Sequence, residues 1–346
     1  MKKFELNLQL LADAYNPQAQ PVNHTGAAAL SAEMKTFYDM TLIDEASANL
    51  VHDQFGQKRP IPAGGGKIIE FRKFSPLAKA TTPITEGVTP TGKALNVSAF
   101  TAAVKQYGDF IVQSDVLELT SLDNTILEAT KLLGKQAGAT LDTIVRDELQ
   151  GGTNVTYCPK IGADGTETEV ESRKDLDATC KLTVDVVQQV VAKLRAQNAP
   201  TINGKYVAII HPYVAYDLMR DPEWIDAHKY TNVTNLYEGE IGEIAGVRFV
   251  QTTEAKIYKG SDKEPEGLAV FGSLFLGENA YGVTEITGGG LQTIVKQKGS
   301  AGTGDPLDQR SSVGWKAIKT ARILVQNYIV RVESCSPRFS ATADAN

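Results

Sequence analysis

The most constraining feature of this sequence is one long helical pattern over residues 121–152. Apolar residues recur there at steps of three and four, which places them on one stripe of a helix. The stripe consists of Leu122, Ile126, Ala129, Leu133, Ala137, Leu141 and Ile144. Ser121 is a suitable N-cap, and Gly151 and Gly152 end the pattern. At about 1.5 Å per residue the helix is roughly 40 Å long, the width of a small domain. We therefore expect a spine helix across which other elements, or other subunits, are laid.

Two glycines lie inside this helical pattern, one turn apart, at Gly134 and Gly138. Each costs about 1 kcal/mol relative to alanine in a helix interior. Close approach of another backbone to this face is one reason to carry that cost. The alternative is plain tolerance of glycine within a long helix.

Residues 66–110 have little apolar interior of their own. Strand patterns at 68–74 and 96–113 flank a stretch at 75–92 that is rich in proline, glycine and threonine. An isolated two-stranded hairpin is marginally stable in water, and long structureless loops are usually functional. We therefore expect this hairpin to be stabilised by lying on another subunit. The alternative is the substrate lid of an enzyme.

The N-terminal residues 1–28 contain a short alternating pattern at Phe4, Leu6, Leu8 and Leu10. We interpret them as an arm that could add to a neighbouring subunit, with a frayed terminus as the alternative. A helix capped by Ser31 follows and fades near Phe55. Its apolar face comprises Met34, Phe37, Tyr38, Leu42 and Ala46.

Residues 182–280 have the pattern of a mixed α/β domain. A helix opened by Thr183 carries an apolar face rich in valine, and 206–210 is a continuous apolar run typical of a strand covered on both faces. Further strands are predicted at 247–251 and 268–271. After a polar loop at 299–311, two final strands are predicted at 315–319 and 321–332, packed against the spine, and residues 336–346 read as a loose tail.

Composition narrows the class of protein. The net charge of −6 and the pI of about 5.4 argue against a nucleic-acid-binding module, which would carry a basic face. They do not exclude a protein that encloses nucleic acid without gripping it. Cys158, Cys180 and Cys335 are widely spaced and odd in number, so reduced cysteines are expected. No secretory signal and no apolar run of membrane-spanning length is visible.

The sequence contains no complete catalytic or ligand-binding motif. Lys67 follows three glycines, but the rest of the phosphate-loop pattern is missing, and no G-x-S-x-G occurs. His211 ends a predicted strand, yet no carboxylate or cysteine pattern accompanies it, so we expect neither metal nor cofactor. Glu238, Glu240 and Glu243 read as a solvated acidic turn. Trp224 and Trp315 are interpreted as packing residues.

The segment EGEIGEIAGVRFV, residues 238–250, carries a recognisable motif. It resembles the I-G-x-I-x-G-V segment common in major capsid proteins of tailed bacteriophages, which have the Hong Kong 97-type fold. The motif residues here are Ile241, Gly242, Ile244, Gly246 and Val247. The physical interpretation agrees, because glycines permit a tight turn leading into the strand 247–251.

A second segment, residues 305–316, looks like the D-P-L-x-Q-R-x-S-x-G-W-K segment of one branch of that family. The matching residues include Asp305, Pro306, Gln309, Arg310, Gly314 and Trp315. The opening residues 3–12 look like the short leader seen there. The resemblance covers nearly the whole chain, and the order of elements matches.

The resemblance implies an α+β, Hong Kong 97-type capsid fold with a long spine helix, an extended β-hairpin loop, and peripheral and axial domains. The expected parts are an N-terminal arm (1–28), the first helix region of the peripheral domain (29–63), the extended loop (64–110), the spine helix and peripheral domain (111–181), an axial α/β domain (182–280), return strands of the peripheral domain (281–335) and a tail (336–346).

The implied function is that of a major capsid protein and not of an enzyme. Copies would assemble through hexamers and pentamers into the icosahedral phage head that encloses double-stranded DNA, and the mature protein would reside in the virion after assembly in the bacterial cytoplasm. Because the arm is short, a separate scaffolding protein is expected, together with a portal. The alternatives are an encapsulin-like nanocompartment shell, which has the same fold around a cargo enzyme, and a cytosolic α/β enzyme with 66–110 as a lid.

Overall fold

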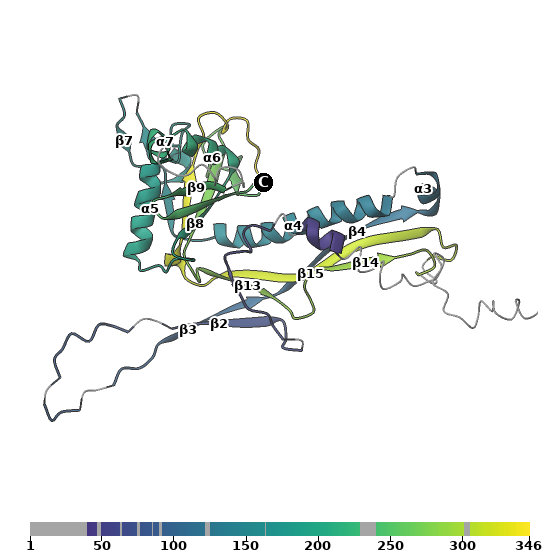
Figure 1. Cartoon of the computed structure of the whole chain (residues 1–346), viewed down its shortest axis with the longest axis horizontal. Coiled ribbons are helices and arrows are strands. Elements are labelled where there is room, and N and C mark those ends of the chain that lie inside the picture. The colour runs from purple at the N-terminus through teal and green to yellow at the C-terminus, as the bar shows by residue number, and fades with distance from the viewer. Residues whose placement is uncertain are drawn as a thin grey trace, which may run out of the picture. The chain divides into compact units, whose positions relative to one another are not determined.

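The computed structural model describes most of the chain (Figure 1). The described residues are 40–46, 50–62, 64–74, 77–84, 86–89, 92–121, 125–162, 164–228, 240–300 and 305–346. The N-terminal arm and the first part of the helix predicted from Ser31 lie outside them. The chain divides into two compact units, which are described in turn. Unit 1 comprises Met1–Glu45, Gly108–Gly134 and Gln292–Lys316, and unit 2 comprises Ala46–Tyr107, Lys135–Leu291 and Ala317–Asn346.

Unit 2 is built on a seven-stranded sheet with the order β5-β16-β12-β8-β10-β9, to which β11 adds beside β12. The strands are β5 (Val155–Tyr157), β8 (Tyr206–Ile210), β9 (Glu240–Ile244), β10 (Val247–Gln251), β11 (Ile257–Tyr258), β12 (Val270–Leu276) and β16 (Ile329–Ser334). Strand β8 runs parallel to β10 and antiparallel to β12. All five residues of β8 are buried, as the apolar run at 206–210 predicts.

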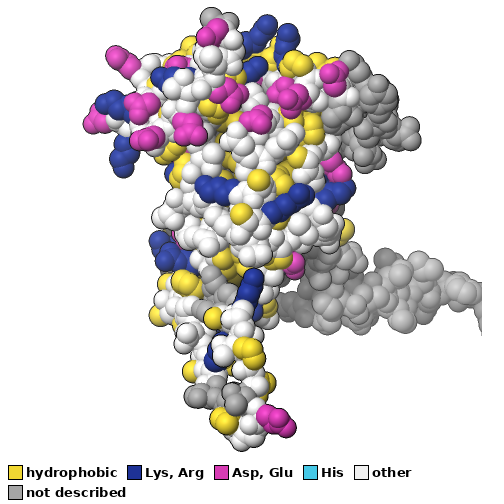
Figure 2. Space-filling model, turned by 90° about the vertical axis from the view of Figure 1, so that its left-hand side faces the viewer, with side chains coloured by type: hydrophobic (Ala, Val, Ile, Leu, Met, Phe, Trp, Pro, Cys, Tyr) yellow, Lys and Arg dark blue, Asp and Glu magenta, His cyan; other side chains and the backbone are white. Residues whose placement is uncertain are grey.

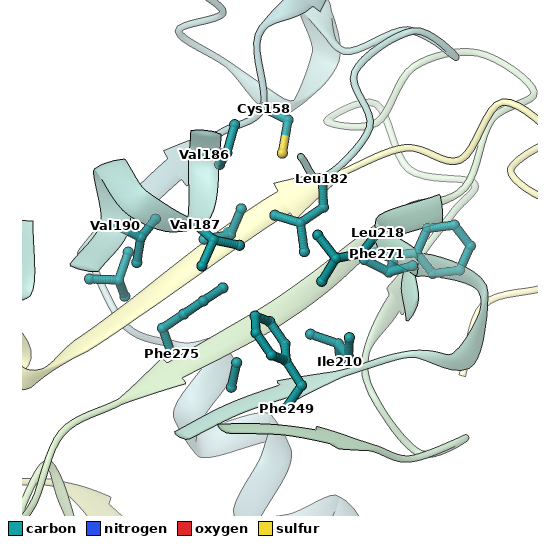
Figure 3. Packing of buried hydrophobic residues seen from close by; sticks show 14 of the residues in the cluster. Cys158, Leu182, Val186, Val187, Val190, Ile210, Leu218, Phe249, Phe271 and Phe275 are labelled. Atoms are coloured by element: carbon teal, nitrogen blue, oxygen red, sulfur yellow. The ribbon is translucent and has the colours of Figure 1, made fainter. Parts of the chain in front are cut away.

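The two faces of this sheet are covered by different helices. Ala208 and Ile210 belong to one core cluster with α5 (Val184–Ala196), whereas Val207 and Ile209 belong to another with Val145 and Leu149 of α4 (Thr125–Gln150). Side chains alternate across a strand, so β8 feeds both cores. Figure 3 shows Val187 and Val190 of α5 on the same side of the sheet as the rings of Phe275 and Phe249, and all four belong to this cluster. Each such fully buried side chain stabilises the fold by roughly 1.5–3 kcal/mol.

Helices α6 (Pro212–Met219) and α7 (Pro222–His228) extend the first of these cores. Trp224 of α7 packs edge-on against Phe249, with ring centroids 5.6 Å apart. This is the packing role that the sequence predicts for Trp224. Thr183 caps α5 by accepting a hydrogen bond from the Val186 N–H.

Helix α4 (Thr125–Gln150) occupies most of the predicted spine, and residues 122–124 before it are not described. Ser121, which the sequence predicts as the N-cap of the spine, is instead the C-cap residue of a short helix, α3 (Asp115–Thr120). The buried stripe of α4 runs through Ala137, Leu141, Val145 and Leu149, so it follows Val145 and not the predicted Ile144.

A buried polar contact ties the segment after the first helix to α4. Asp142 accepts hydrogen bonds from the backbone N–H groups of Val51 and His52, at 2.9 and 2.7 Å. Its second oxygen lies 2.6 Å from Nδ1 of His52. Tyr281 donates its hydroxyl hydrogen to the His52 carbonyl. Segment 51–52 is thereby fixed to both α4 and the strand β13 (Tyr281–Glu285).

Strands β2 (Ile68–Phe74) and β3 (Val97–Ala103) pair antiparallel, with Phe71 opposite Phe100. This is the predicted hairpin. Phe71 at its base is 2% exposed, whereas every described residue from 77 to 99 is exposed. The predicted strand 96–113 is two strands. Val104 lies between them and donates its N–H to the Lys67 carbonyl, and β4 (Lys105–Ser114) pairs with β15 (Arg310–Ile323) instead of β2.

The return strands differ from the prediction. One strand, β15 (Arg310–Ile323), replaces the predicted polar loop end and the break at Thr320. Its inward positions stay at every second residue because Lys319 takes one of them and pairs with Asp53 at 2.9 Å. A 3₁₀ turn, η4 (Gln326–Tyr328), then separates β15 from β16.

Two expectations about parts of the chain differ from the structure of unit 2. Strand β16 pairs with β12 and β5, so residues 329–334 and 155–157 share a sheet with the predicted axial segment and not with the other return strands. Residues 336–346 are not a loose tail. Ser340 is fully buried, Phe339 stacks on Tyr213 with centroids 4.2 Å apart, and the Asn346 side chain bonds to the backbone of Ala255 and Ile257.

The remaining strands belong to one two-stranded sheet and to a five-stranded sheet with the order β1-β13-β15-β14, in which β4 pairs with β15. Within unit 2, β1 (Gln57–Lys58) lies parallel to β13, and β13 runs antiparallel to the later half of β15. A hairpin joins β6 (Lys160–Ile161) and β7 (Glu167–Thr168), and η1 (Arg173–Asp175) follows. Within unit 1, β14 (Gln292–Lys296) runs antiparallel to the first half of β15.

Candidate assembly and fold-defining sites

The first motif forms the hairpin between β9 and β10. Ala245 and Gly246 form its two-residue turn, with φ values of 53° and 79°. Positive φ at both central positions defines the turn that matches the twist of paired strands. Gly242 also has a positive φ, 118°, and lies opposite Phe249. Ile241 lies in β9, Ile244 packs against the core, and Val247 is fully buried. The motif therefore sets the edge of the seven-stranded sheet.

The second motif begins with a turn closed by Asp305. Its Oδ2 accepts a hydrogen bond from the Arg310 N–H at 2.8 Å, and its carbonyl accepts one from the Asp308 N–H at 3.1 Å. Pro306 and Leu307 occupy the exposed tip of this turn. Gln309 accepts a bond from the Asp115 N–H at 2.9 Å, which joins the turn to the start of α3.

Gly314 and Trp315 of the same motif lie where β15 meets β4. A Cβ on Gly314 would lie 2.6 Å from the Phe110 Cβ, and one on Gly108 would lie 2.6 Å from the Trp315 carbonyl oxygen. Both distances are shorter than real contacts allow, so only glycine fits at either position. Trp315 is 3% exposed, in keeping with its predicted packing role.

Gly134 faces the first helix within unit 1. A Cβ there would lie 2.9 Å from the Leu42 carbonyl oxygen. Gly138 is buried as well. Alanine at position 134 would thus clash with the Leu42 backbone. Close approach of another backbone is one of the two explanations that the sequence analysis gives for this glycine.

A buried ionic network was not foreseen from the sequence. Arg173 binds both oxygens of Glu333 at 2.6 Å, and its third nitrogen lies 3.2 Å from Glu264. Arg331 also contacts Glu333, at 2.8 Å. Burial lowers the pKa of Arg173, but hydrogen bonds and the charge of Glu333 outweigh burial and raise it. The partners are 160 residues apart, so no local pattern could have revealed them.

His211 is a structural residue. It is the N-cap of α6, and its Nδ1 accepts a hydrogen bond from the Tyr213 N–H at 3.2 Å. Burial lowers its pKa to about 4, so the ring is neutral at pH 7. Cys158, Cys180 and Cys335 are buried free thiols, and burial raises the pKa of each.

Neither a metal cluster nor a membrane helix occurs within the part of the chain that the structure describes. Over those residues, no group of three or more histidine, cysteine, aspartate or glutamate side chains could hold a metal ion. Likewise, none of the described helices is both long and apolar enough to cross a bilayer.

Comparison with known proteins identifies solved structures that are similar to this chain and a family model that matches it. Three solved structures are similar over almost its full length. The capsid asymmetric unit of cyanophage Pam1 is 13% identical, with a TM-score of 0.63, covering 99% of this chain and 100% of that one. The capsid of cyanophage P-SCSP1u is 13% identical (TM-score 0.62; 91% and 93% covered), and that of Ralstonia phage GP4 is 14% identical (TM-score 0.61; 96% and 97% covered).

At such low identities these likenesses establish the fold, which is the expected α+β, Hong Kong 97-like fold. No curated protein matches the sequence. A family model described as phage capsid protein matches residues 96–329, well over half of the chain. The chain therefore belongs to the phage capsid protein family.

Proposed function

We propose that copies of this major capsid protein join as hexamers and pentamers and close an icosahedral head around double-stranded DNA. The protein is a structural subunit of the head shell. The enzyme alternative is set aside because this chain belongs to a family of phage capsid proteins. The observation that carries assembly through neighbours is the exposed β2–β3 hairpin.

The loop of the hairpin carries apolar side chains that are exposed. Leu77, Ile84, Val88 and Leu95 are each between 59% and 76% exposed. In Figure 2 basic and hydrophobic side chains are interspersed over the hairpin, in the lower part of the view. Covering such a side chain yields roughly 1.5–3 kcal/mol. In a shell, a neighbouring copy would supply that cover, and many such contacts would add up to a stable particle.

The remaining parts take the roles that the family resemblance implies. The segment 182–280, with β16 and β5 in its sheet, would be the axial domain that meets its copies at the centre of a capsomer. The segments around α4 and β15 would be the peripheral domain, held tightly at Gly134 and Gly138. The arm of residues 1–28 would tie neighbouring subunits, while a separate scaffolding protein and a portal would guide assembly in the bacterial cytoplasm.

Deleting the hairpin loop tests this proposal. Residues 76–99 are replaced by a short glycine-serine turn, and the variant is expressed with its neighbouring genes. We expect folded monomers or small oligomers in size-exclusion chromatography and no particles in electron microscopy. A variant that assembles as the parent does would overturn the role of the hairpin. Nucleic acid inside parent particles distinguishes a phage head from a nanocompartment around a cargo enzyme.

A further inference from the structure

Three free thiols share one core of unit 2, and we call them the thiol cluster. Cys158 follows β5, Cys180 lies shortly before α5, and Cys335 follows β16. Each is at most 1% exposed and belongs to the core cluster of the sheet that includes α5. Burial raises the pKa of Cys158 and Cys335, and a charge on Cys180 would raise both further. The three sulfur atoms are therefore within electrostatic reach of one another, although the shell function proposed above makes no use of them.

A backbone contact singles out one pair of this cluster. The N–H of Cys335 donates a hydrogen bond to the Cys180 carbonyl at 2.8 Å. Main chains joined by such a bond hold their Cα atoms about 5.5 Å apart, and a disulfide spans Cα atoms about 4.4–6.8 Å apart. Cys158 instead donates its N–H to the Glu333 carbonyl. The backbone thus places Cys180 and Cys335 at the separation that a disulfide needs.

The sulfur of Cys180 lies beneath a surface turn. It accepts a hydrogen bond from the Asp177 N–H at 3.3 Å, and the Asp177 side chain is 42% exposed. The turn continues through Thr179, which is exposed and whose carbonyl accepts the Lys181 N–H at 2.8 Å. Opening of one short turn costs less than unfolding of the whole domain. A small reagent can therefore reach Cys180 while the sheet stays folded.

Cys335 lies at the start of the folded C-terminal segment 336–346. That segment is attached by a few local contacts: the Ser340 hydroxyl accepts the Ser336 N–H at 2.7 Å, and the Ser340 carbonyl accepts the Ala269 N–H at 2.8 Å. A covalent bond at Cys335 would fix the start of this segment to the loop before α5. It would also close a loop of roughly 150 residues, and long loops constrain the unfolded chain most.

We infer that Cys180 and Cys335 form a disulfide after the protein leaves the reducing cytoplasm, and that this bond fastens the C-terminal segment to the loop before α5. The inference goes beyond the proposed function, and only its timing rests on that function, because a shell protein made inside a cell is later released from it. Disulfides persist in oxidising surroundings and are rare in the cytosol.

The oxidant is a small disulfide of the glutathione class. The Cys180 thiolate attacks one sulfur of the oxidant and displaces one small thiolate, which leaves a mixed disulfide on Cys180. The Cys335 thiolate then attacks the Cys180 sulfur and displaces the second small thiolate. The oxidant is reduced to two thiols, and the protein loses two hydrogen atoms, about 2 Da in mass.

Counting free thiols tests the bond. Assembled particles are incubated with a mixture of reduced and oxidised glutathione, and unassembled subunits are refolded in the same mixture, so that access to buried sulfur does not limit the reaction. Alkylation in denaturant and mass spectrometry then count the free cysteines. We expect one alkylated cysteine, Cys158, and a peptide pair joined through Cys180 and Cys335. Treatment with dithiothreitol should restore three alkylated cysteines.

The matched control is Cys158→Ser, which should form the same bond, whereas Cys180→Ser and Cys335→Ser should not. In the parent, oxidation should lower the equilibrium constant of unfolding of the subunit about thirtyfold or more, and in Cys180→Ser the two redox buffers should give equal values. Three free cysteines in refolded subunits, a bond that includes Cys158, or glutathione that stays attached would overturn the pairing.

A bond that forms in refolded subunits and not in particles would overturn its place in the released particle. None of these outcomes depends on the hairpin, so a failure of the disulfide leaves the proposed shell function intact. A protein that does not assemble still allows the disulfide to be tested in its subunits.

Discussion

The seven-stranded sheet and the β2–β3 hairpin belong to the same unit, yet they are stabilised in opposite ways. The sheet is covered by α5 on one face and α4 on the other, so β8 has no exposed residue. The hairpin carries comparable apolar side chains and exposes every described residue from 77 to 99. The sheet has its cover within one copy, whereas the proposed function has a neighbouring copy cover the hairpin. We therefore expect mutations in the two regions to affect different measurements.

The largest expected effect is on the free energy of unfolding, when a buried ring of the sheet is removed. Phe275→Ala removes a fully buried ring and should lower the free energy of unfolding of the unassembled subunit by about 3–5 kcal/mol. The matched substitution Ile84→Ala in the loop should change it by less than about 0.5 kcal/mol. Denaturant unfolding of both variants checks the difference. Equal losses would mean that the hairpin is packed within its own copy.

A smaller effect is expected at the ionic network, which tests whether polar burial also holds the sheet region together. Arg173→Met leaves Glu333 fully buried, and Arg331 is then its remaining basic partner among the residues that the structure describes. Breaking a buried pair costs about 3 kcal/mol at the lower end of its range, and the remaining arginine favours that end. The control is Lys160→Met, whose partner Asp177 lies 3.4 Å away at the surface and should contribute less than about 1 kcal/mol. Similar losses in the two variants would contradict the role of the network.

The sequence predicts those parts of the fold that depend on a local hydrophobic period. The valine face of α5, the buried run of β8 and the hairpin strands at 68–74 and 97–103 all follow from periods of 3.6 or 2. The turn at Ala245 and Gly246 follows from glycine spacing, and Gly314, at the contact between β4 and β15, lies within a motif. These features depend on residues close together in the chain.

The parts that sequence reasoning missed depend on distant partners. The charge of Lys319 predicts the end of a strand at this position. In the structure the strand continues, because Lys319 is paired with Asp53, a residue far away in sequence. The sequence of residues 336–346 predicts a loose tail because its partners lie far away in the chain. Phe339 stacks on Tyr213, and the Asn346 side chain donates a hydrogen bond to the Ala255 carbonyl. The place of β16 beside β12 is likewise a choice among several possible neighbours that its own residues do not encode.

The smallest expected effect concerns pH and the first core of the sheet. Burial holds the pKa of His211 at about 4, below the ordinary value of 6.5. Between these values the unfolded chain binds a proton that the folded chain does not. His211 therefore contributes stability that is fully present above about pH 6.5 and is lost as pH falls toward 4, with a slope of at most about 1.4 kcal/mol per pH unit. His211→Asn keeps a side-chain acceptor at the N-cap of α6 and cannot titrate. Unfolding of unassembled subunits at pH 7 and pH 5 should show a smaller loss for the variant than for the parent. Because His211 packs against Phe271 in the sheet and not in the hairpin, the same pair of measurements on the loop-deleted chain should give the same difference. A difference that disappears with the loop would mean that the hairpin contributes to the sheet core within one copy.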